Sequence, residues 1–299
     1  MKYTLKTHRK KILADTITPV SVYLRLRDKF PNSLLLESSD YRANDNTFSY
    51  ICCKPIASIT VKNEVITEVF PDGTTTTTTI EGDTDVVGII EGFAKKFETE
   101  DNEQKFIQNG LFGYMSYDAV RYFEDIEVTK KEAQLDVPDL YYAVYQNIIA
   151  INHFNNEAHI FSHTYNEENN LSQIAQLLTV KSFAEYHFKL EGEQQSQMSD
   201  EAFIELVKTC KKHCQRGDVF QIVPSKRFSQ GFSGDEFNVY RSLRSVNPSP
   251  YLFFFDYGNF KIFGSSPEAQ LIVKEGKAEI HPIAGTFKRT GNDEKDAAL

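Results

Sequence analysis

Three polar residues and one glycine in the last third of the sequence carry groups that could act on a ligand. Gln221 lies between Val219 and Val223 in a short apolar run, so a strand there would place its amide on the same side as two apolar side chains. Glu268 brings a carboxyl group directly after a serine-proline pair, which also begins ordinary helices. Gly285-Thr286 combines a bare backbone with a hydroxyl group, and such a turn can approach an anionic ligand closely. Each position also has an ordinary structural explanation: an edge strand facing water for Gln221, a helix start for Glu268 and a common turn for Gly285-Thr286. None of them therefore indicates a function alone.

Histidines and cysteines give no metal-binding pattern. His159 and His163 are four residues apart in a predicted strand, where they share a face without forming a helical metal motif, so we interpret them as structural. Cys52-Cys53 are adjacent, and Cys210 and Cys214 are four apart on a predicted helix. Neither pair has the spacing of a structural zinc site, so reduced, packed thiols are expected.

Composition and charge limit the class of protein. The chain has 299 residues, of which 40% are hydrophobic, 13% aromatic and 25% charged, the composition of a soluble globular protein. The net charge of −9 argues against a nucleic-acid or anionic-membrane binder but allows a local positive pocket for a small anionic substrate. The N-terminus has no apolar run of signal-peptide length and no stretch approaches a spanning helix, so a cytoplasmic protein without a membrane segment is expected.

Apolar spacing in the first 190 residues predicts a mixture of strands and helices. A short apolar run predicts a buried strand over 33–38, and β-branched runs on both sides of Pro71-Asp72-Gly73 predict a hairpin. Helical spacing is found over 85–97 and 171–180. Alternating or aromatic runs predict strands over 111–117, 140–151 and 158–165.

The stretch 191–198 is polar and breaks this pattern, which predicts a boundary between one domain over 1–190 and a second over 199–299. Ser199 can cap a helix that ends at Arg216-Gly217. The elements predicted after it are a strand over 219–223, a helix over 236–245 and hairpins over 251–265 and 270–282. The pattern is that of a mixed α+β chain, without a Walker loop or a dinucleotide fingerprint.

Six blocks of the sequence resemble the large subunit of anthranilate synthase, and they occur in the same order as in that family. The blocks are LLLES at 34–38, GLFGYMSYD at 110–118, GDVFQIVPS at 217–225, NPSPYLFF at 247–254, GSSPE at 264–268 and PIAGT at 282–286. The resemblance implies an α+β fold of two domains, each with layered antiparallel or mixed β-sheets and flanking helices. It also implies that 1–190 binds tryptophan and that 199–299 begins the chorismate-binding catalytic domain.

The family is expected to convert chorismate and ammonia to anthranilate and pyruvate in tryptophan biosynthesis, with Mg²⁺ as cofactor and a glutamine amidotransferase subunit as the source of ammonia. It is subject to allosteric feedback inhibition by L-tryptophan. Carried over residue by residue, the tryptophan site comprises Glu37, Ser38, Pro250, Tyr251 and Leu252. Gly285 and Thr286 match chorismate contacts, and Glu268 matches the general acid that protonates the departing ring hydroxyl.

Two further positions bear on the reaction that the resemblance implies. Gln221 stands where relatives that add water carry a lysine base, and an uncharged glutamine activates water poorly, whereas ammonia needs no such activation. Ala284 stands where the sister enzyme, aminodeoxychorismate synthase component I, carries a nucleophilic lysine. Both positions favour anthranilate as the product. The sister enzyme and a non-catalytic tryptophan-binding fragment remain the alternatives.

The resemblance also implies that the catalytic domain is incomplete in these 299 residues. The family continues after the block at 282–286 with helices that carry glutamates and histidine, and the metal ligands are expected there, beyond Leu299. No metal ligand is therefore predicted within this chain. The chain alone is expected to lack catalytic activity.

Overall fold

The computed structural model confirms an α+β fold and describes residues 1–38, 47–100, 106–128, 135–283, 285 and 288–297. The chain divides into two compact units. Unit 1 comprises Met1–Glu185 and Tyr240–Pro267, and unit 2 comprises Tyr186–Val239 and Glu268–Leu299.

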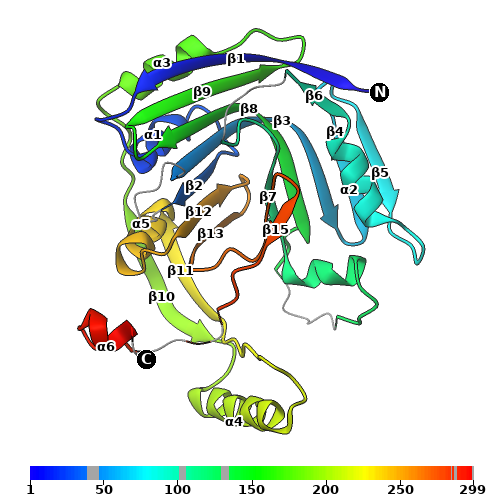
Figure 1. Cartoon of the computed structure of the whole chain (residues 1–299), viewed down its shortest axis with the longest axis vertical. Coiled ribbons are helices and arrows are strands. Elements are labelled where there is room, and N and C mark those ends of the chain that lie inside the picture. The colour runs from blue at the N-terminus through cyan, green and yellow to red at the C-terminus, as the bar shows by residue number, and fades with distance from the viewer. Residues whose placement is uncertain (39–46, 101–105, 129–134, 284, 286–287, 298–299) are drawn as a thin grey trace. The chain divides into compact units, whose positions relative to one another are not determined.

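Unit 1 is built on one large, mostly antiparallel sheet (Figure 1). The strands run along the sheet in the order β13-β12-β2-β3-β8-β9-β1-β6, with β4 and β7 branching from β3 and β8, and β5 pairing with β4. Its strands are β1 (Tyr3–Leu13), β2 (Leu34–Ser38), β3 (Phe48–Lys62), β4 (Val65–Val69), β5 (Thr75–Thr79), β6 (Phe97–Thr99), β7 (Leu111–Met115), β8 (Leu140–Asn152), β9 (Glu157–Thr164), β12 (Tyr251–Asp256) and β13 (Lys261–Ser266). The described helices are α1 (Pro19–Leu26), α2 (Val86–Ala94), a 3₁₀ helix η1 (Tyr117–Tyr122) and α3 (Leu171–Thr179).

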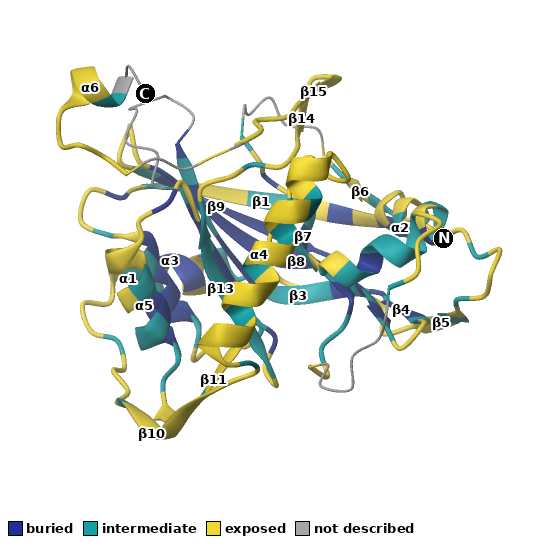
Figure 2. Cartoon of the chain, turned by 90° about the horizontal axis from the view of Figure 1, so that it is seen from below, coloured by how far each residue is buried: buried dark blue, intermediate teal, exposed yellow. Residues whose placement is uncertain are grey.

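Over its described residues, unit 2 has two separate two-stranded sheets and little buried surface. Strand β10 (Phe188–Ser196) pairs with β11 (Phe228–Gly234), and β14 (Ile272–Lys274) pairs with β15 (Lys277–Glu279). Helix α4 (Asp200–Arg216) has no buried residue, as Figure 2 shows by its mostly yellow ribbon, and α6 (Asp293–Ala297) is a short helix near the end of the chain. Helix α5 (Phe237–Val246) begins in unit 2 and belongs to unit 1 from Tyr240 onward.

The core of unit 1 lies on both faces of the central strands, because β8 is buried along almost its whole length. On one face the Tyr3 ring stacks on Phe70 at 5.4 Å and Phe97 at 5.9 Å between centroids. A second cluster gathers Cys52 and Tyr145 with aromatic residues of other strands. Cys52 and Cys53 are free and fully buried, which confirms the expected packed thiols for this pair, whereas Cys214 is exposed.

Most predicted strands and helices are confirmed within one or two residues. The hairpin around Pro71-Asp72-Gly73 forms from β4 and β5, with Gly73 at φ 80°, a conformation that glycine adopts without strain. Helix α4 begins and ends as predicted: the Ser199 hydroxyl accepts a hydrogen bond from the Ala202 N–H at 3.2 Å, and Gly217 adopts φ 79° after Arg216.

Two stretches differ in local structure from what their sequence pattern indicates. The polar stretch 191–198, where the pattern breaks and a domain boundary is predicted, lies largely in β10, where Phe188 stacks on Phe232 at 5.5 Å and the backbone pairs with β11. The stretch 219–223, predicted as a strand around Gln221, has no regular structure. Backbone pairing with β11 stabilises the segment 191–198 as a strand, whereas the segment 219–223 has no such pairing. Local apolar spacing does not reveal whether a segment pairs with a strand elsewhere in the chain.

The compact units also differ from the predicted division into 1–190 and 199–299. One junction, at Glu185, lies close to the predicted boundary, but Tyr240–Pro267 is part of unit 1. The reason is that β12 pairs with β2 over five positions and so joins the first sheet. The sequence pattern gives the strand but not its partner.

Gly113 gives a test of the packing of β7 on β8. Gly113 pairs with Tyr142, and a Cβ at this position would overlap the backbone carbonyl oxygen of Tyr141. We therefore expect Gly113→Ala to lower the free energy of unfolding by about 1–3 kcal/mol through overpacking. The matched control is Gly92→Ala in α2, where a Cβ meets nothing within 4 Å and alanine should raise the free energy of unfolding by about 0.5–1 kcal/mol. Urea denaturation followed by circular dichroism measures both, and equal effects of the two substitutions would contradict the described packing.

Candidate functional site

The two halves of the predicted tryptophan site meet on adjacent strands of unit 1. Glu37 and Ser38 end β2, and Tyr251 and Leu252 begin β12. In the antiparallel pairing Tyr251 lies opposite Ser38 and Leu252 opposite Glu37. Pro250 directly precedes β12 and is exposed. The structure therefore brings together two short runs of residues, 37–38 and 250–252, that are far apart in the sequence.

These residues point to two faces of the sheet. Residues directly opposite each other on paired strands share a face, and successive residues alternate. Glu37 and Leu252 are therefore on one face, where both are buried, at 5% and 2% exposure. Ser38 and Tyr251 are on the other, where Tyr251 keeps 43% of its surface exposed. A small ligand can reach Ser38 and Tyr251 more readily than the Glu37 side chain.

The Glu37 carboxylate is held by two residues of α5. The Tyr240 hydroxyl donates a hydrogen bond to Glu37 Oε2 at 2.5 Å, and Arg244 Nε lies 3.0 Å from Oε2 and 3.2 Å from Oε1. Burial and the neighbouring Glu37 charge raise the pKa of Tyr240 well above its ordinary value. The hydroxyl therefore stays protonated and remains a donor, and the buried carboxylate has both a cation and a neutral donor beside it.

A second hydrogen-bond chain supports the backbone of Ser38. The Ser38 N–H donates to Ser49 Oγ at 3.2 Å, and Ser49 Oγ lies 2.7 Å from His153 Nε2. Burial lowers the pKa of His153; the Glu37 charge opposes this shift and the Arg244 charge reinforces it. A neutral His153 ring can therefore donate to or accept from Ser49 near neutral pH.

The loop between α5 and β12 is held at its first residue, Asn247, by two hydrogen bonds. The Asn247 N–H donates to the Leu243 carbonyl at 2.8 Å, and the Asn247 carbonyl accepts from Ser265 Oγ at 2.6 Å. Ser249 is buried. These contacts fix the path of the chain from α5 to Pro250.

The predicted chorismate residues lie in unit 2 and are exposed. Gln221, Glu268 and Gly285 each have an exposed side chain or backbone, whereas Ala284 and Thr286 lie outside the described residues. Glu268 comes two residues after the end of β13. The catalytic and substrate-binding roles of these positions stay predictions.

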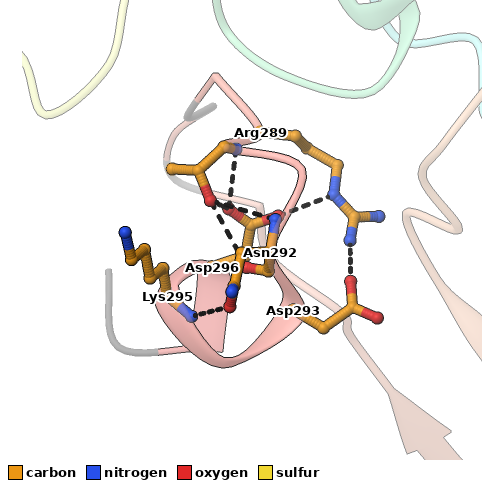
Figure 3. Close-up of polar contacts among 6 residues, drawn as sticks. Arg289, Asn292, Asp293, Lys295 and Asp296 are labelled. Atoms are coloured by element: carbon orange, nitrogen blue, oxygen red, sulfur yellow. Dashed lines mark hydrogen bonds and ion pairs between the residues drawn. The ribbon is translucent and has the colours of Figure 1, made fainter.

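A compact polar cluster follows the predicted chorismate turn (Figure 3). Arg289 bonds to Asp293 at 2.6 Å and to Asp296 at 3.0 Å, and Thr290 Oγ1 donates to Asp296 at 2.7 Å. Hydrogen bonds from Thr290, with the Arg289 bond, lower the pKa of Asp296 to about 2. The Asn292 side chain accepts from the Lys295 N–H at 3.1 Å and so caps α6. Because the residues of this cluster are mostly exposed, it orders the segment locally and adds little to the stability of the fold.

The described residues show no ligand set for the expected Mg²⁺. No group of three or more His, Cys, Asp or Glu side chains among them is placed to hold a metal ion. The two histidines interpreted as structural are packed in the sheet: His163 bonds to Thr7 Oγ1 at 3.0 Å and to the Gln108 carbonyl at 2.8 Å, and the His159 ring lies 4.9 Å from Phe106.

In the part of the chain that the structure describes, no helix is both long and apolar enough to span a membrane.

Sequence reasoning missed the residues that surround Glu37. Tyr240 and Arg244 are four apart on the predicted helix over 236–245, so they share one helical face, directly before the block at 247–254. That spacing was the available signal. Ser49 and His153 gave none, because their contact depends on the register of β3 with β8.

Comparison with known proteins agrees with the α+β fold of this chain. Residues 31–299 match the family model described as chorismate binding enzyme. Anthranilate synthase component 1 of Lactococcus lactis is 33% identical over 302 residues, covering 97% of this chain and 63% of that protein. The crystal structure of anthranilate synthase component I from Streptococcus pneumoniae is 25% identical with a TM-score of 0.61, covering 90% of this chain and 60% of that one.

A more distant match indicates the breadth of the fold. The menaquinone-specific isochorismate synthase of Escherichia coli matches with a TM-score of 0.52 at 12% identity, over 90% of this chain and 52% of that one, which is a likeness of fold alone. The chain spans about 60% of the length of the curated relatives that it matches. With nine-tenths of its residues within one family model, the chain belongs to the chorismate binding enzyme family.

Proposed function

We propose that this chain belongs to the large subunit of an anthranilate synthase that is inhibited by tryptophan. The reaction converts chorismate and ammonia to anthranilate and pyruvate. The observation that carries the proposal is the pairing of β2 with β12, which places Ser38 opposite Tyr251 and Glu37 opposite Leu252. Relatives about 30% identical to this chain over nearly its whole length are named anthranilate synthase component 1.

Two residues support this reaction over its sister reactions. Gln221 cannot serve as the base that would activate water, and Ala284 has no nucleophile with which to form a covalent intermediate. An enzyme with neither group is suited to direct attack by ammonia. The sister enzyme aminodeoxychorismate synthase is therefore the less favoured assignment.

Glu268 is the proposed general acid. Hydroxide is a poor leaving group, so the carbon–oxygen bond of the ring hydroxyl breaks readily only if a proton reaches that oxygen as it leaves. A protonated Glu268 carboxyl group donates this proton, and the hydroxyl departs as water. We propose Gly285 and Thr286 as contacts to chorismate, and a glutamine amidotransferase subunit as the source of ammonia.

Ligand-dependent stability tests the proposed regulatory site in this chain. L-Tryptophan should raise the free energy of unfolding by RT ln(1 + [L]/Kd), about 2.7 kcal/mol at a hundredfold excess over Kd. Thermal melts with and without L-tryptophan measure the change, and L-leucine at the same concentration is the control for nonspecific effects of an amino acid. Equal shifts with both amino acids, or no shift, would remove the feedback assignment while leaving the chorismate chemistry to be tested separately.

A further inference from the structure

We infer that Glu37 acts on the tryptophan site indirectly and does not itself contact the ligand. Its carboxylate holds α5 against β2, and α5 in turn holds the loop over 247–250 in place. Tyr240 and Arg244 are the positioning residues that complete this anchor. The inference rests on the proposed function, because it concerns how the same site is built.

Strand geometry separates Glu37 from the accessible side of the site. Ser38 and Tyr251 lie opposite each other on one face of the sheet, and Glu37 projects to the other face together with Leu252. On that second face the Tyr240 ring packs 5.6 Å from Phe254 and 6.4 Å from Phe263. Glu37 therefore projects into the layer between the sheet and α5.

The hydrogen-bonding capacity of the Glu37 carboxylate is directed to α5. Its side chain is only 2% exposed, and both oxygens accept from α5: Oε2 from Tyr240 and from Arg244, and Oε1 from Arg244. The Arg244 side chain balances the charge and remains 44% exposed. A ligand ammonium group would have to displace Arg244 to reach this carboxylate, and that would leave a cation without its partner.

Helix α5 passes the effect of this anchor to residues at the ligand face. The helix ends at Val246, and the following Asn247 is held by Leu243 and by Ser265 of β13. The loop then continues to Pro250 and Tyr251. If Glu37 no longer holds α5, the position of Pro250 and Tyr251 relative to Ser38 is no longer fixed. The loss appears as weaker ligand binding without any lost ligand contact.

A double-mutant cycle on the 299-residue chain tests this assignment, with L-tryptophan affinity measured by titration calorimetry. Glu37→Gln and Arg244→Gln should each weaken binding by roughly 2- to 150-fold, the range of coupling between contacting residues, and the double variant should bind no more weakly than the worse single variant. Multiplied effects in the double variant would overturn the inference. Arg244→Lys keeps the cation and should recover part of the lost affinity.

The ligand's ammonium group gives a second, independent readout. Indole-3-propionate lacks the ammonium, so the ratio of its Kd to that of L-tryptophan measures recognition of this group. The inference expects the ratio to be unchanged in Glu37→Gln, because both ligands lose the same positioning. A ratio that falls toward one would show direct contact between Glu37 and the ammonium and would overturn the inference.

Two provisions keep the test decisive. Tyr240→Phe removes only the hydroxyl and keeps the ring packing. If Glu37→Gln fails to fold, Tyr240→Phe takes its place in the cycle with Arg244→Gln. If the wild-type chain binds no tryptophan, the proposed regulatory function fails. The anchor is then judged from unfolding of the unliganded variants, where additive losses of stability for Glu37→Gln and Arg244→Gln would refute it.

Discussion

Replacing Glu268 with glutamine in the complete protein that contains this chain is expected to lower kcat by about 10²- to 10⁴-fold, the usual effect of losing a general acid. Glutamine has nearly the same shape as glutamate but cannot deliver an acidic proton to the departing hydroxyl. Chorismate binding should change far less than kcat, because the proton moves only as the bond breaks. Steady-state kinetics with ammonium as the nitrogen source measures both quantities.

The matched control for this substitution is Glu294→Gln. Glu294 is an exposed acidic residue of α6 in the same unit and has no proposed role in the reaction. Its replacement should leave kcat within about twofold. A loss of less than about threefold in Glu268→Gln would mean that Glu268 is only a residue at the start of an ordinary turn or helix.

Ser38→Arg is expected to abolish the stabilisation of this chain by tryptophan, removing the roughly 2.7 kcal/mol that a hundredfold ligand excess provides. Ser38 lies directly opposite Tyr251 on the accessible face, so a long charged side chain there fills the space that the ligand needs. The free energy of unfolding without ligand should change little, because Ser38 is at the end of a strand and only partly buried. Thermal melts with and without L-tryptophan separate the two effects.

Thr77→Arg is the control for the added charge and bulk. Thr77 is exposed on β5, which pairs with β4 and with no other strand among the described residues. This variant should keep the full tryptophan shift. A full shift in Ser38→Arg as well would place the tryptophan site elsewhere in the molecule.

Much of the fold could be predicted because several strands carry their own pattern. The apolar run of β2, the threonine-rich hairpin of β4 and β5 and the long aromatic strand β8 depend on local β-propensity and burial. Strands β1 and β3 were not predicted. In β1 basic residues occupy exposed positions next to buried Tyr3 and Leu5, and β3 contains Pro55 at a shift in its register with β8.

The residues of the candidate site were also predicted only in part. The resemblance identified Glu37, Ser38, Pro250, Tyr251 and Leu252, and the pairing of β2 with β12 then placed them together. The resemblance did not reveal that Glu37 and Ser38 point to opposite faces, because that follows from strand register. Nor could local sequence reveal the partners of Glu37, since Tyr240 and Arg244 reach it only through tertiary packing.

The predicted chorismate residues show that a local sequence pattern can also predict a strand that does not form. Gln221 was predicted to lie on a strand because two valines flank it at strand spacing. The structure gives this segment no regular structure, so the local pattern had no partner strand to pair with. The assignment of Gln221 and Glu268 therefore depends on their position in the family blocks rather than on the geometry around them.

Product analysis is the most direct test of the central proposal. The complete protein that contains this chain should be incubated with chorismate, ammonium and magnesium, and the product followed by fluorescence and identified by chromatography against standards. The proposal predicts anthranilate and pyruvate in equal amounts, with inhibition by L-tryptophan. Formation of aminodeoxychorismate or isochorismate in place of anthranilate would contradict it.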